Sequence, residues 1–241
     1  MKRWFKIAIL LFGTLAQFKA VRAQTLLGIP GLVHVPTADF MRDGTFYVGC
    51  SFLPRQTLSY SNYSRDGLVL FSSLTFLPYI EVDLKFTKQL GRSAGQGHTV
   101  DRSPSIRFKV LSERRSRPAV VIGLHDVYST VQDGHARHFG ATYVVLGKRF
   151  PISKFLIAPS LGYGFDAFKG QNKSLLGLFG GVRIRSVYFR RAALLFEYDS
   201  NNVNVGADLY MDRTFRIKCG LLNFQYFSAS ASMHFDLFDV F

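Results

Sequence analysis

The stretch QYFSASASMHFDLFDVF, residues Gln225 to Phe241, runs as two interleaved sequences. Apolar or small side chains hold the odd positions from Phe227 to Leu237, whereas Ser, His and Asp hold the even positions from Ser228 to Asp236. Successive side chains of a β-strand point to opposite faces, so one face here is apolar and the other is small or polar. A soluble β-sandwich can show this alternation, but its continuation to a C-terminal Phe241 is typical of the closing strand of an outer-membrane barrel.

Eleven further segments upstream repeat this pattern at about the 9–11 residues that a tilted transmembrane strand requires. The clearest is 80–87, where Ile, Val, Leu and Phe alternate with Glu, Asp, Lys and Thr. We therefore predict an all-β chain that forms a single transmembrane antiparallel β-barrel of about 12 strands, with a range of about 8–14. The predicted strands are Gly44–Leu53, Gly67–Phe76, Tyr79–Thr87, Ser105–Ser112, Ala119–Val127, Phe139–Arg149, Lys154–Phe165, Leu175–Ser186, Ala192–Asp199, Val203–Met211, Thr214–Leu222 and Gln225–Leu237.

The connections between these segments alternate in length. The odd connections, such as 54–66 and 88–104, are long, whereas even ones such as 77–78 and 212–213 are short. The contrast weakens toward the C-terminus. Outer-membrane barrels have short periplasmic turns and longer extracellular loops, so the pattern places both chain ends in the periplasm.

The first 23 residues have a different character. A basic head is followed by an apolar core over 7–16 that is too short to span a bilayer as a helix, and Val21-Arg22-Ala23 offers a cleavage site. We predict a signal peptide over 1–23, an irregular lead-in over 24–43 and the barrel over 44–241, located in the outer membrane after secretion.

Charged side chains gather on the face opposite the apolar stripe, which is the lumen face of the predicted barrel. Both signs are present, so they can guide an anionic glycan or form a salt-bridge network that fills a narrow interior. These residues are Glu81, Asp83, Lys85, Arg107, Lys109, Arg183, Arg185, Glu197, Asp199, Asp208, Arg216 and Lys218.

The short turns and their flanks carry a second set of charges, the basic rim. Two acidic residues, Glu113 and Asp212, oppose nine basic ones, a net +7. This rim can meet anionic lipid headgroups, or it can dock an acidic periplasmic export protein or gather an anionic polymer. The basic residues are Arg114, Arg115, Arg117, Lys148, Arg149, Lys154, Arg190, Arg191 and Arg213.

The overall charge of +14 includes five basic residues in the first 23, and the remainder holds 25 basic against 16 acidic residues, a net +9. A secreted chain without an aromatic-basic recognition motif favours anionic glycans or lipids over nucleic acid as partners. Cys50 and Cys219 fall on strands that are not neighbours, and no His–Cys spacing suggests a metal site. His234 is expected in the lumen beside Ser232, without the elements of a hydrolase, so no catalytic residue, metal or cofactor is expected.

Several short elements resemble the YjbH-like exopolysaccharide-biosynthesis family of outer-membrane proteins, and they occur in order along nearly the whole mature chain. They are Gly31-Leu32, Pro36-Thr37-Ala38, Asp43-Gly44, Ile106-Arg107-Phe108-Lys109-Val110-Leu111, Gly123-Leu124-His125-Asp126, Gly147-Lys148-Arg149-Phe150, Leu161-Gly162-Tyr163-Gly164, Glu197-Tyr198-Asp199 and Asn204-Val205-Gly206. The chain departs from the family at Val127-Tyr128-Ser129-Thr130, where glycines are usual, and many members are far longer. The resemblance implies a barrel that acts in the production or export of extracellular polysaccharide.

The resulting hypothesis is a non-enzymatic outer-membrane barrel that is an accessory or conduit for extracellular polysaccharide. The alternatives are a structural or adhesive barrel without cargo and, third, a barrel lipid hydrolase. The expected partners are outer-membrane lipids, the barrel-assembly machinery, for which Phe241 is the predicted signal, and, for a conduit, an anionic polysaccharide and a periplasmic export protein.

Overall fold

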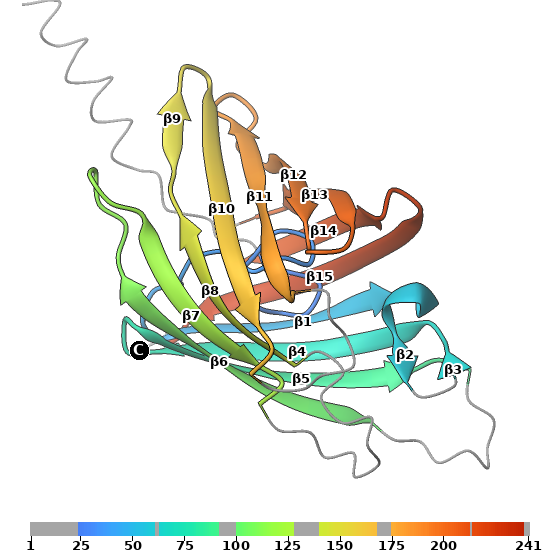
Figure 1. The fold of residues 1–241 in the computed structure, drawn as a ribbon. Helices are drawn as coiled ribbons and strands as arrows, with labels where there is room; N and C mark the ends of the chain where they lie inside the picture. The colour runs from blue at the N-terminus through green and yellow to red at the C-terminus, as the bar shows by residue number, and fades with distance from the viewer. Residues whose placement is uncertain are drawn as a thin grey trace, which may run out of the picture.

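The chain forms a closed antiparallel β-barrel, described here from a computed structural model for residues 24–60, 63–91, 100–127, 140–167, 175–212 and 214–238 (Figure 1). Twelve strands make its wall. They are β1 (Thr45–Leu53), β4 (Gly67–Phe76), β5 (Ile80–Gln89), β6 (Asp101–Leu111), β7 (Ala119–His125), β8 (Ala141–Gly147), β10 (Phe155–Phe165), β11 (Gly177–Ser186), β12 (Ala192–Tyr198), β13 (Val203–Tyr210), β14 (Phe215–Leu222) and β15 (Tyr226–Asp236). The predicted fold class and strand number are confirmed.

Each wall strand pairs antiparallel with its neighbours in chain order, and the ring closes where the first wall strand, β1, pairs with the last, β15. The register of that seam runs from Thr45 opposite Asp236 to Phe52 opposite Ala229. A thirteenth strand, β9 (Phe150–Ile152), pairs only with the start of β10 and extends the wall at this point. The sequence pattern predicts a connection over 150–153, whereas in the structure residues 150–152 form β9 and Ser153, with a φ of 52°, lies in the turn that follows.

The side chains have an inside-out distribution. In β5, Glu81 is fully buried and Lys85 is 3% exposed, whereas the intervening Val82 is 46% exposed. In β15, Ser228 is fully buried and Phe227 is 55% exposed. A water-soluble protein buries its apolar side chains and exposes its charges. An apolar outer surface around a polar interior is the distribution of a transmembrane barrel.

The two ends of the barrel differ. At one end, the short-turn end, the connections are 77–79, 112–118, 148–154, 187–191 and 211–214; at the other, the long-loop end, four of the six connections are longer. The long-loop end carries a 3-10 helix, η1 (Arg55–Thr57), and a small hairpin of β2 (Ser59–Tyr60) and β3 (Tyr63–Ser64). Within the described ranges, no helix is long and apolar enough to cross a membrane.

Candidate functional site in the barrel lumen

The lumen is occupied by the chain's own N-terminal segment, residues 24–41, which we call the plug. In Figure 1 it is the blue trace enclosed by the ring of strands. Nearly all of its residues are buried, including Leu26, Leu32 and Val35 at 0% exposure. It has turns but little regular structure, with isolated bridges joining Gln24 to Pro30 and Gly31 to Pro36. An irregular segment inside a barrel must find partners for its backbone polar groups, and here its own turns and the wall together supply them.

Glu197 of β12 holds the middle of the plug. Its carboxylate accepts the backbone N–H groups of three successive plug residues, at 2.8 Å from Val33, 2.8 Å from His34 and 3.1 Å from Val35. Asn204 of β13 donates its amide to the same carboxylate at 2.9 Å. Hydrogen bonds to an ionised acceptor are roughly twice as strong as neutral ones, so this carboxylate is the main clamp on the plug.

A second contact involves groups that lie outside the wall strands. Nδ1 of His34 lies 3.6 Å from Asp199, which follows β12. Burial lowers the pKa of His34, but the hydrogen bond and charge of Asp199 outweigh it, so this pKa is raised. Burial raises the pKa of Asp199, yet the His34 contact and two Asn hydrogen bonds leave it lowered. The His34 contribution is lost as pH rises through its raised pKa and the Asp199 contribution as pH falls through its lowered one, so the contact is strongest in mildly acidic solution.

Three cations of the wall hold carbonyl oxygens of the plug. Lys218 of β14 donates to the carbonyl of Leu32 and lies 3.0 Å from Asp208 of β13. Arg183 of β11 donates to the carbonyl of Gly31 at 2.8 Å. Arg107 of β6 donates to the carbonyls of Thr37 and Asp39 and to Glu81 of β5 at 2.9 Å. These wall charges therefore pair both with one another and with the plug.

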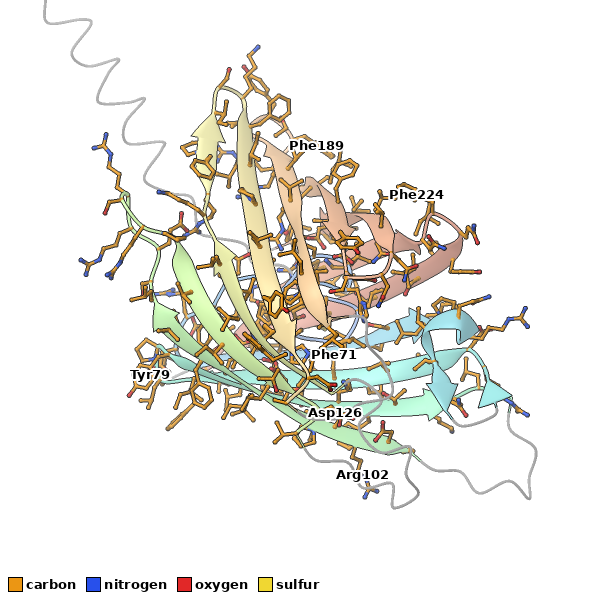
Figure 2. The ribbon with its side chains drawn as sticks, in the orientation of Figure 1. Phe71, Tyr79, Arg102, Asp126, Phe189 and Phe224 are labelled. Atoms are coloured by element: carbon orange, nitrogen blue, oxygen red, sulfur yellow. The ribbon has the colours of Figure 1, made fainter. Side chains whose placement is uncertain are left out.

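Apolar packing completes the closure on both sides of the plug. Leu26, Leu27, Leu32 and Val33 form one cluster with residues of β1, β4, β12 and β14, and this cluster includes Phe71. The other cluster packs Val35, Ala38 and Phe40 of the plug against β7, β8 and β11. Figure 2 shows Phe71 within the barrel, while Phe189 and Phe224 stand at its outer surface.

Glycines of the wall make room for the plug. A Cβ at Gly206 or Gly220 would lie 2.7 or 2.6 Å from a methyl carbon of Val33, and one at Gly181 would lie 2.5 Å from a methyl carbon of Leu32. These distances are closer than side chains approach without moving. At Gly181 and Gly206 a wall carbonyl oxygen, of Phe196 at 2.3 Å and of Cys219 at 2.7 Å, also meets the added Cβ. At Gly220 the next atom after Val33 is 3.5 Å away, so Gly220 is the position that is shaped to the plug.

A cavity of about 150 Å³, the mouth cavity, remains at the short-turn end between the end of the plug and the wall. The residues that give it its chemistry are Asp39, Phe40, Lys109, Lys148, Arg149 and Arg183, and Glu113 also lines it. Four cations against two carboxylates leave a surplus of positive charge. A β-bulge between Lys109 and Leu111 interrupts the pairing of β6 with β7 at this point, as bulges beside functional sites often do.

A comparison with protein families identifies the family to which this chain belongs. Residues 23–177, which cover the plug and the wall through β10, match the family described as exopolysaccharide biosynthesis protein, YjbH. The chain belongs to the YjbH family. A comparison with curated proteins gives no match. Among solved structures, the YjbH-family chain is similar to an outer membrane channel from Pseudomonas putida F1, at 11% identity and a TM-score of 0.43, over 81% of this chain and 96% of the other.

The twelve predicted lumen charges of this YjbH-family chain all lie on inward-facing positions, and eleven are buried; Lys109, at the mouth cavity, is half-buried. The lumen charges with a hydrogen bond to the plug or an ion pair with it include Arg107, Arg183, Glu197, Asp199 and Lys218. Others lie in the wall away from those contacts, such as Arg216, whose guanidinium stacks 4.8 Å from the ring centre of Tyr210. The alternating pattern of the strands does not reveal that the lead-in, residues 24–43, is their partner.

The predicted basic rim lies around the short-turn end. Arg114, Arg115, Lys154, Arg190 and Arg191 are exposed, and Arg117 is half-buried. Arg149 donates to Glu113 through both its backbone N–H, at 2.9 Å, and its side chain, at 2.7 Å. Lys148 donates to the carbonyl of Arg115 at 3.0 Å. Arg213, Phe241 and the predicted signal peptide lie outside the described residues.

Proposed function

We propose that this chain is a non-enzymatic outer-membrane barrel that serves as a conduit or accessory for extracellular polysaccharide, and that its plug keeps the lumen closed until export. The observation that carries the proposal is the attachment of the plug. It is held by hydrogen bonds, one carboxylate clamp and packing, and among the described residues no disulfide ties it to the wall, so these contacts can break and form again. A lumen lined with charges of both signs suits passage of a charged polymer better than a purely structural interior.

A barrel without cargo is the second candidate, and the closed lumen favours it. Polar networks and packing that fill an interior also stabilise a scaffold. The two candidates differ in whether the plug moves during the protein's work. Weakening the plug's contacts at Glu197 and locking the plug to the wall with a disulfide separate them.

Deletion of the gene is expected to reduce surface polysaccharide, and complementation with the full chain is expected to restore it.

Cell fractionation should recover the mature protein in the outer membrane, with the heat-modifiable gel migration of a folded barrel. Removal of Phe241 should lower the amount inserted, because this residue is the proposed assembly signal. Recovery of the full chain as a soluble periplasmic protein would contradict the membrane location, and unchanged polysaccharide in the deletion strain would contradict the role in export.

Reversal of the basic rim tests whether it recognises a partner. The side chains of Arg114 and Arg115 project from a turn that backbone hydrogen bonds between Arg114 and Arg117 already close, at 3.0 and 3.2 Å. Changing all three arginines to Glu is therefore expected to leave insertion intact but to reduce cross-linking to an acidic periplasmic protein and polysaccharide export. Changing the same residues to Gln is the matched control for loss of charge without reversal. A reversed protein that inserts and exports normally would show that the rim is not a recognition surface.

A further inference from the structure

The mouth cavity has a carboxylate of the plug bound in it. Oδ2 of Asp39 accepts a hydrogen bond from Arg183 at 2.8 Å, and this pair is only 19% and 10% exposed. Asp39 is one of the last residues of the plug, so its carboxylate marks where the plug ends and the open mouth begins. An anionic group that entered the cavity from the short-turn end would meet the same guanidinium.

The remaining lining is built to receive negative charge. Lys109 lies 4.8 Å from the ring centre of Phe40, and Lys148 lies 5.7 Å from that of Phe150. The cavity's other carboxylate, Glu113, is taken by Arg149 at 2.7 Å. Because a single water needs only about 10–15 Å³ by the same measure, a cavity of about 150 Å³ admits a carboxylate together with much of the sugar ring that carries it.

The position of these residues excludes a lipid as the occupant. Lys109 and Arg183 are at inward-facing positions of β6 and β11, and the alternate residues Phe108 and Val110 face outward at 38% and 52% exposure. A lipid headgroup approaches the outer surface of a barrel, whereas Lys109 and Arg183 line the mouth cavity from the inner face of the wall. The occupant must therefore arrive along the path that a transported polymer would take.

We propose that the mouth cavity binds an acidic sugar unit of the polysaccharide through its carboxylate, and that this carboxylate competes with Asp39 for Arg183. The proposal rests on the proposed function and adds the substrate class. Binding would remove one of the two contacts that Arg183 makes with the plug and leave the other, its hydrogen bond to Gly31. Cargo at the mouth would thus favour release of the plug, since a ligand shifts an equilibrium toward the state that it binds better.

Isothermal titration of the purified barrel in detergent with trigalacturonate tests this inference, with maltotriose as the neutral control. We expect Asp39→Asn to bind trigalacturonate about tenfold more tightly than wild type, because the competing carboxylate is gone. The double variant Lys109→Gln/Lys148→Gln is expected to bind about tenfold more weakly. Raising the salt concentration should weaken binding by the wild type, and heat-modifiable migration confirms that each variant is folded.

Equal affinity of wild type and Asp39→Asn for trigalacturonate would overturn the competition. If the wild type binds maltotriose as tightly as trigalacturonate, the preference for acidic sugars would be overturned. Tighter binding of a hexaglutamate peptide than of trigalacturonate would assign the cavity to a protein partner instead. This binding assay does not depend on export. A deletion strain that loses polysaccharide while the barrel fails to bind trigalacturonate would reject the site and keep the function. If the barrel binds trigalacturonate but the deletion strain keeps its polysaccharide, the binding site would stand and the proposed function would be rejected.

Discussion

Glu197→Ala is expected to lower the free energy of unfolding by about 3–5 kcal/mol and to open the lumen. The substitution leaves the backbone N–H groups of Val33, His34 and Val35 without their acceptor, and each unsatisfied buried donor costs about 1–3 kcal/mol. These donors belong to the plug, so much of the cost falls on the plugged state alone. If about 2.7 kcal/mol falls there, the open population rises about 100-fold.

Planar-bilayer recordings measure this directly as a higher open probability, and denaturant titration measures the stability. Glu113→Ala is the matched control, because the carboxylate of Glu113 lies at the short-turn end and binds Arg149 instead of the plug. Glu197→Gln should lie between the variant and wild type, since it keeps one oxygen acceptor. A Glu197→Ala barrel that is folded and as closed as wild type would show that the carboxylate does not clamp the plug.

Joining the plug to the wall by a disulfide is expected to abolish export reversibly. A Cβ added at Gly220 lies 3.7 Å from the Cβ of Val33, within the range of about 3.5–4.5 Å that disulfides require. Val33→Cys together with Gly220→Cys therefore places two thiols in bonding position. Val33→Cys also removes one of the methyl carbons that the new side chain at Gly220 would crowd. The oxidised protein should show no channel opening and no surface polysaccharide above that of the deletion strain.

The background for this experiment is a chain in which both native cysteines are changed to Ala. Cys50 and Cys219 are free and half-buried, in β1 and β14, and Cys219 adjoins the engineered site. Reduction with dithiothreitol should restore export, and each single cysteine variant should export normally with or without oxidant. Normal export by the fully oxidised double variant would mean that the plug stays in place during the protein's work, and the scaffold candidate would then stand.

The wall could be predicted from the sequence because its signal is local. In β5 each inward Glu, Asp or Lys alternates with an outward Val or Leu, and a period of two is visible within eight residues. The lipid and the lumen impose opposite requirements on alternate positions, so few other folds would produce the pattern. The strand ends shifted by a few residues at most of the predicted strands, since hydrogen bonding and not polarity decides them.

The plug could not be predicted in the same way, because its partners are distant in the chain. Glu197 lies more than 160 residues from the three N–H groups that it accepts, and nothing near Glu197 distinguishes it from a carboxylate that pairs across the wall. The plug itself has no period, since its contacts alternate between wall charges and apolar clusters. Gly206 and Gly220 were the available signal: two inward glycines on adjacent strands indicate that something packs closely against them.

The seam between β1 and β15 imposes an order of events on biogenesis. The plug precedes β1, and β15 follows all the other wall strands, so the ring can close only after β15 has been made. Folding this segment for the first time inside a finished ring would require it to find its many buried contacts after entering through one end. Zipping the two terminal strands together around a segment already folded against β11, β12 and β14 requires no such step. We therefore expect the protein to enclose its own N-terminal segment as it matures, and a chain that stops before β15 is expected to form the plug contacts of Lys218 and Glu197 on an open sheet.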